Sequence, residues 1–162
     1  MNPRLRSALA VFVWLALSAG ASAQLAQKKA LTLEIAKRIA AAAEKEAAGN
    51  NLTMVIAILD DGGNLIYLER MDETQIASID VAQQKARSAV SFKRPTKAFE
   101  DALAGGRTAI LRLPGAIPVE GGVPLLADGK VVGAIGCSGG TSPQDGVVAK
   151  AGADALVKIL GR

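Results

Sequence analysis

Two short polar turns, each placed between two runs of β-forming residues, constrain the fold of this chain most. The first turn is Asp-Asp-Gly-Gly-Asn at 60–64, between the runs 52–59 and 65–70. The second is the Asp128-Gly129 pair, between two apolar runs. Such turns predict β-hairpins, and Asp-Gly is among the strongest short signals for one. Because helical patterns separate the two hairpins, the sequence predicts an α+β domain with an antiparallel sheet covered by helices.

Four segments repeat apolar residues at spacings of three and four, which predicts helices. The last is the clearest, with Ser142 as its expected N-cap, Pro143 at its first position and Asp145 in its first turn. The other three are expected to begin after Thr32, at Ser78, which could cap its own helix, and after Thr96. The predicted order is helix, hairpin, helix, short helix, loop, hairpin, helix.

The first 23 residues have the pattern of a secretory signal peptide. Arg4 and Arg6 precede an apolar run at 8–17, and Ala-Ser-Ala at 21–23 fits a cleavage site. This predicts an exported protein, periplasmic or secreted, whose residues 24–162 form a single domain. No second apolar run is long enough to span a bilayer, so no membrane attachment is expected after removal of the signal.

The composition excludes several kinds of site. The chain has no histidine, which rules out Ser-His-Asp and Cys-His catalysis, histidine-bound zinc and a proximal histidine for haem. Its one cysteine, Cys137, lies in an apolar strand pattern and is expected to be a small buried residue. The net charge of +4 falls to +2 without Arg4 and Arg6, and the remaining charges are interspersed, so nucleic-acid binding is not expected.

The glycines of the second hairpin raise the question of a nucleotide site. They follow the pattern G-x-x-G-x-x-G-G, from Gly133 and Gly136 to Gly139 and Gly140. This differs from the dinucleotide fingerprint, and no further strand or P-loop lysine follows. Two readings stay open. The missing side chains could admit a ligand, with an anion at the N-terminus of the last helix, or they could relieve crowding in the packed sheet.

Three motifs in this order resemble the GlcG/HbpS family, also called the haem-degrading domain family and found at the C-terminus of PduO-type proteins. They are MVIAILDDGGNLIYLERMD at 54–72, AQQKARSAVSFKRPT at 82–96 and IPVEGGVPLLADGKVVGAIGCSGGTSPQD at 117–145. The resemblance covers about residues 31–160. It implies a profilin-like α/β/α domain with a five-stranded antiparallel sheet, and self-association into a homo-oligomer. It also implies binding of haem or another small molecule, sometimes a corrinoid-related one.

The candidate ligand-binding residues come from these motifs: Lys85, Arg94, Thr96, Glu120, Gly121, Gly122, Gly136, Gly139, Gly140 and Asp145. For most of them a plain structural role is an equal or stronger alternative. Glu120 and its two glycines could form a surface turn, and Lys85 could lie on a solvated helix face. Thr96 and Asp145 could simply stabilise helix starts.

Haem binding would need an unusual ligand set in a chain without histidine. The side chains that could supply an axial sulfur or oxygen are Met54, Tyr67, Met71, Thr96 and Cys137. Only three aromatic residues remain after the signal to sandwich a porphyrin: Tyr67, Phe92 and Phe99. Tight haem binding with a conventional ligand is therefore not expected, whereas loose binding at a subunit interface, with the propionates on lysine or arginine, stays open.

Three functions remain. The first is an exported oligomeric small-molecule-binding protein, possible ligands being haem or a small anion, that is accessory to a catabolic or redox system. The second is an enzyme acting on a small organic acid or on haem, with Glu120 or Asp145 as general base. The third is a structural subunit of a periplasmic dehydrogenase. Because no nucleophile–base couple or metal cluster is visible in the sequence, binding is favoured over catalysis.

Overall fold

The computed structural model describes residues 24–161 and confirms each predicted helix and both hairpins. The elements are α2 (Leu33–Gly49), β1 (Val55–Asp60), β2 (Leu65–Arg70), α3 (Ser78–Phe92), α4 (Lys97–Ala104), a 3₁₀ turn η1 (Thr108–Arg112), β3 (Gly122–Ala127), β4 (Lys130–Ser138) and α5 (Ser142–Ile159). The predicted signal peptide lies outside the described residues. Within the described part, no helix is both long and apolar enough to cross a bilayer.

The sheet of the described chain has four antiparallel strands in the order β2-β1-β4-β3. Each hairpin supplies two of them, and β1 pairs with β4 along its whole length, from Val55↔Ser138 to Asp60↔Gly133. β2 and β3 are therefore the edge strands. The expectation of a fifth strand was wrong. Between α4 and β3 the chain forms η1 and a loop with Pro114 and Pro118, which have no N–H to donate to a ladder.

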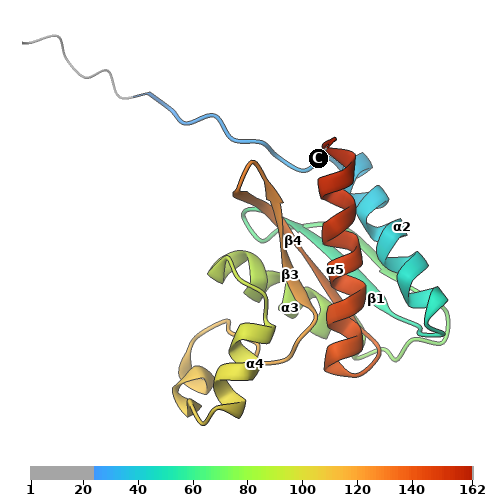
Figure 1. The fold of residues 1–162 in the computed structure, drawn as a ribbon, viewed down its shortest axis with the longest axis vertical. Helices are drawn as coiled ribbons and strands as arrows, with labels where there is room; N and C mark the ends of the chain where they lie inside the picture. Colours follow the sequence, from blue (N-terminus) through green and yellow to red (C-terminus); the bar gives the residue numbers. More distant parts are fainter. Residues whose placement is uncertain (1–23, 162) are drawn as a thin grey trace, which may run out of the picture.

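The helices lie in two layers, with α2 and α5 on one face of the sheet and α3 on the other (Figure 1). Alternate residues of β1 face the two layers. Ile56 and Ile58 join the core under α2 and α5, whereas Val55, Ala57 and Leu59 join the smaller core under α3. This arrangement agrees with the predicted antiparallel sheet covered by helices, and its α/β/α layers agree with what the family resemblance implied.

Glycines let the central strand β4 approach its neighbours closely on both faces. A Cβ at Gly136 would collide with the backbone of α3 at Ala82 and Ala86, and a Cβ at Gly133 would collide on the opposite face with the carbonyl of Leu59 and with Leu31. At these two positions the space left by the missing side chain is occupied by other residues of the chain, not by a ligand. Gly136, one of the candidate ligand-binding residues, thus makes room for α3.

The helix starts differ from the sequence prediction in three places. Thr32 does cap α2, because its hydroxyl accepts the N–H of Ile35 at 3.3 Å. The N-cap of α5, however, is Thr141 rather than Ser142, and the Thr141 N–H donates to Gln144 Oε1 at 2.9 Å. Ser78 and Thr96 cap no helix with their side chains. Both are buried, and their hydroxyls contact strands instead: Ser78 Oγ accepts a hydrogen bond from Ser138 Oγ, and Thr96 Oγ1 accepts one from the Gly122 N–H.

A small lobe formed by α4, η1 and the loop before β3 projects from one end of the sheet (Figure 1). Phe99 is its buried residue and meets Phe92 edge to face, with 5.1 Å between ring centroids. The lobe is joined to β3 through Thr96, whose N–H donates to the Gly122 carbonyl at 3.0 Å. This connection fixes α4 beside the edge of the sheet and creates the groove described next.

Candidate functional site

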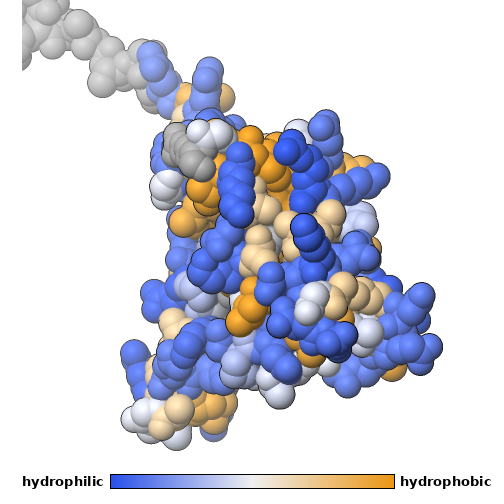
Figure 2. Space-filling model, turned by 45° about the vertical axis from the view of Figure 1, so that its right-hand side comes forward, coloured by the Kyte–Doolittle hydropathy of each residue, from blue (hydrophilic) through white to orange (hydrophobic). Residues whose placement is uncertain are grey.

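A groove of about 380 Å³ lies between the start of α4, the edge strand β3 and the outer face of α5. It is lined by Pro95, Lys97, Glu120, Gly121, Gly122, Val123, Pro124, Leu126, Gly146, Lys150, Ala153, Asp154 and Val157. Most of these residues are apolar or glycine. Figure 2 shows apolar residues gathered at the upper end of the domain and interrupted by hydrophilic side chains.

A buried ion pair lies beneath the loop that leads into β3. Lys85 Nζ is 2.6 Å from Asp145 Oδ2 and also donates to the Cys137 carbonyl at 3.2 Å. The exposed fractions of the two side chains are 1% and 4%, so the expected solvated position of Lys85 was wrong. Its spacing placed it on the α3 face that packs on the sheet, where a partner carboxylate offsets the cost of burying an ammonium.

Burial raises the pKa of the Asp145 carboxyl, although Lys85 and the N–H of Gly140 both lower it. The N–H of Gly140 donates to Asp145 Oδ1 at 2.9 Å. The anion site predicted at the N-terminus of α5 is therefore filled by the chain's own carboxylate. Gly139 has a packing role as well, because a Cβ there would collide with the Thr53 carbonyl.

Gly121 separates the ion pair from the groove. Its φ of +127° is one that residues with a side chain rarely adopt, and a Cβ would lie 2.8 Å from Asp145 Cβ and 2.9 Å from Lys85 Nζ. The neighbouring Gly122 donates its N–H to Thr96 Oγ1 at 2.9 Å, so Thr96 anchors the groove floor from below. The wall of the groove is thus one backbone thick at this point.

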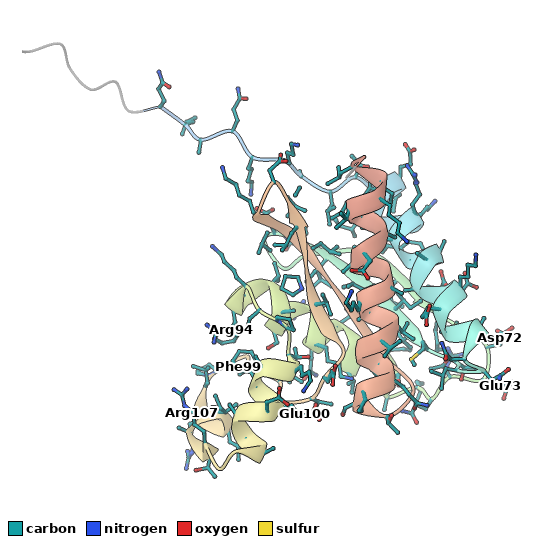
Figure 3. All side chains as sticks on the ribbon, viewed as in Figure 1. Asp72, Glu73, Arg94, Phe99, Glu100 and Arg107 are labelled. Atoms are coloured by element: carbon teal, nitrogen blue, oxygen red, sulfur yellow. The ribbon has the colours of Figure 1, made fainter. Side chains whose placement is uncertain are left out.

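Glu120 lines the groove with its backbone held by a hydrogen bond and its carboxylate unpaired within the described chain. Its backbone N–H donates to a carboxylate oxygen of Glu100, and its side chain lies across Gly146, where a Cβ would come within 2.6 Å of Glu120 Cδ. Among the described residues, no hydrogen bond or ion pair reaches the Glu120 carboxylate itself. Figure 3 shows Glu100 on the lobe, on the side of α4 that faces α5 in this view.

The charged Glu120 carboxylate is expected to destabilise the folded protein, and this effect should depend on pH. Partial burial raises the pKa of its carboxyl, as do Glu100 and Asp101, whereas Lys97 and Lys85 lower it. A raised pKa in the folded state means that stability falls as the pH rises through the ordinary glutamate range. We expect Glu120→Gln to raise the thermal midpoint at pH 7, and this gain to disappear below pH 4.5, where the carboxyl is protonated in both states.

The measurement is thermal unfolding followed by circular dichroism between pH 4 and pH 8, with Glu44→Gln, an exposed change on α2, as control. A midpoint for Glu120→Gln at or below that of the unchanged protein at pH 7 would contradict this account of the carboxylate.

Two lysines stand on opposite sides of the groove, and each is held by an aspartate one helical turn further along. Lys97 is 2.6 Å from Asp101 on α4, and Lys150 is 2.6 Å from Asp154 on α5. Exposed pairs of this kind contribute only about 0.3–0.5 kcal/mol. A ligand anion could therefore replace either aspartate at little cost.

The ten candidate residues fall into four places. Glu120, Gly121 and Gly122 line the groove, and Lys85, Thr96 and Asp145 lie directly behind them. Gly136, Gly139 and Gly140 contact the chain's own backbone or side chains. Arg94 is exposed and lies over the Phe99 ring, 5.7 Å from its centroid, away from the groove (Figure 3). Sequence reasoning missed Lys97 and Lys150, whose i,i+4 aspartates resemble any helix surface.

None of the five residues that could have bound haem iron lines the groove. Met54, Thr96 and Cys137 are buried, and burial raises the pKa of the Cys137 thiol far above its ordinary value. Met71 accepts the Met54 N–H at 3.3 Å, and the Tyr67 hydroxyl donates to Glu69. Within the described residues there is also no group of three side chains suited to a metal ion.

Residues 31–154 match the model of the family described as haem degrading protein HbpS-like. The chain belongs to the HbpS-like family. Among HbpS-like relatives, protein GlcG of Escherichia coli strain K12 is 44% identical over 111 residues, which are 68% of this chain and 83% of GlcG.

Solved HbpS-like structures have the same fold. A double mutant of Streptomyces reticuli HbpS superposes with a TM-score of 0.74 at 34% identity, over 86% of this chain and 97% of that one. A PduOC:haem complex superposes with a TM-score of 0.71 at 27% identity, over 78% of this chain and 95% of that one. The family is thus one of haem-degrading and haem-binding proteins.

Proposed function

We propose that this protein binds a tetrapyrrole such as haem in the groove beside β3. The observation that carries the proposal is the composition of the groove, an apolar floor with one lysine on each side. The apolar residues would hold the flat ring, and Lys97 and Lys150 would bind its two propionates. The haem named in the PduOC complex and in the family description supports this choice of ligand.

The size of the groove fits part of this ligand. The groove volume of about 380 Å³ is within the usual range of about 300–1,000 Å³ for small-molecule sites. The volume is near the low end of that range and the groove lies on an open face, so part of a bound tetrapyrrole would be left uncovered. We propose that a second copy of the chain covers that part, in a homo-oligomer whose subunit interface includes the groove.

The proposed setting of this activity rests on the residue pattern at 1–23 and on the family resemblance. The pattern at 1–23 supports export to the periplasm or the medium. An accessory role beside a catabolic or redox system, including contact with a periplasmic dehydrogenase, remains a prediction. Binding without turnover is proposed because, among the described groove residues, no nucleophile is placed beside a base.

The test is a haemin titration of the protein followed by absorbance, with the double variant Lys97→Met/Lys150→Met. We expect saturable binding to the unchanged protein and a loss of about tenfold or more in affinity for the variant, which corresponds to about 1.4 kcal/mol. The matched control is Lys37→Met/Lys45→Met, which removes the same charge from exposed positions on α2. Equal loss in both variants would show that net charge, not the groove, governs binding.

A further inference from the structure

The carboxylate of Glu120 is left without a partner in a groove where every other charge has one. Lys97 and Lys150 are each bound to an aspartate, and the nearby pair of Lys85 and Asp145 is closed on itself. Glu100 is engaged with the backbone N–H of Glu120. In the described part of the chain, only the Glu120 carboxylate combines partial burial in the groove with the absence of a hydrogen bond or ion pair.

The backbone of Glu120 is held in place, and its side chain lies against α5. Glu100 holds its backbone N–H from α4, and the absence of a side chain at Gly146 allows it to lie against α5. The floor beneath it is the Gly121–Gly122 turn, which Thr96 anchors. Three separate elements therefore present one electron-pair donor to the space where the ligand would lie.

A partly desolvated, unpaired carboxylate is stabilised by a ligand that brings an electron-deficient centre to it. Resting on the proposed function, we infer that Glu120 supplies the axial oxygen ligand of the haem iron. The alternative donors are less suitable, because the two lysines are paired cations and no methionine, cysteine or tyrosine lines the groove in the described chain. A carboxylate oxygen is a hard donor that suits ferric iron.

The experiment compares haemin with protoporphyrin IX, which has the same ring and propionates but no iron. Both are titrated into the unchanged protein, Glu120→Gln and Glu44→Gln, with absorbance for haemin and fluorescence for protoporphyrin. We expect Glu120→Gln to lower haemin affinity at least tenfold and to shift the ferric absorption bands, while protoporphyrin affinity stays within twofold. Glu44→Gln removes an exposed carboxylate of α2 that does not line the groove, and it should leave both affinities and the ferric bands unchanged.

The possible failures can be told apart. If Glu120→Gln leaves the ferric bands and the haemin-to-protoporphyrin affinity ratio unchanged, or weakens both ligands equally, the axial role is wrong and the groove still stands. If neither porphyrin binds the unchanged protein saturably, the proposed function fails and the inference fails with it. Thermal unfolding of each variant checks that the fold is retained, which the partly exposed position of Glu120 favours.

Discussion

Replacing Lys85 with Met is expected to lower the free energy of unfolding by about 3–5 kcal/mol. The substitution leaves Asp145 as a buried carboxylate whose ammonium partner, 2.6 Å away, is gone. Loss of the Lys85 charge, which now lowers the Asp145 pKa, raises that pKa further. Because a carboxyl with a raised pKa destabilises the folded state as pH rises, the deficit should shrink when the pH is lowered.

The companion variant Lys85→Met/Asp145→Asn tests the cause of that loss. It removes both charges, and the new amide oxygen can still accept the N–H of Gly140. We expect the double variant to regain more than half of the stability lost in Lys85→Met, measured by urea unfolding with circular dichroism. Lys37→Met, an exposed change on α2, is the control. A loss below about 1 kcal/mol in Lys85→Met would mean that the pair is solvated in the protein.

The second large effect is expected at Gly136, where α3 crosses the central strand. A single added methyl group in Gly136→Ala would collide with the Ala82 carbonyl and lie 2.7 Å from the Ala86 N. Since both neighbours are backbone of the same helix, α3 must move off the sheet. We expect a loss of about 3 kcal/mol, at the upper end for overpacked cores.

The control for Gly136 is the same substitution at Gly49, the last residue of α2. A Cβ there would meet no atom within 4 Å, so Gly49→Ala should be neutral or stabilise the protein by a few tenths of a kcal/mol. Urea midpoints of the two variants give the comparison. Equal stabilities would show that α3 has more room above β4 than its contacts indicate.

The sequence predicted those parts of the fold that depend on local patterns. Both hairpins follow from their turns, and α3 begins at Ser78 as predicted. The number of strands was not predictable in this way. The fifth strand came from the family resemblance, whereas the prolines between α4 and β3 already argued against a strand there.

The candidate site was predicted in part. The loop from Glu120 to Gly122 does line the groove, but Lys85 gave no local signal for its burial, because its carboxylate partner is 60 residues away in the chain. The glycines before α5 left two alternatives open, a ligand anion at the helix start or relief of crowding, and in the structure they contact the chain's own atoms. The group that occupies the helix start could not be predicted from local sequence, because it depends on tertiary packing. In the structure it is the carboxylate of Asp145, a residue of α5 itself.

The edge strand beside the groove also limits how copies of this chain can meet. β3 has β4 on one side only, and Pro124 in its middle has no N–H to offer to any further strand. A neighbouring molecule at this edge would find a gap in the row of donors and could not continue the sheet without a break. At Pro124, therefore, side chains or a bound ligand would have to supply any contact that the backbone cannot make.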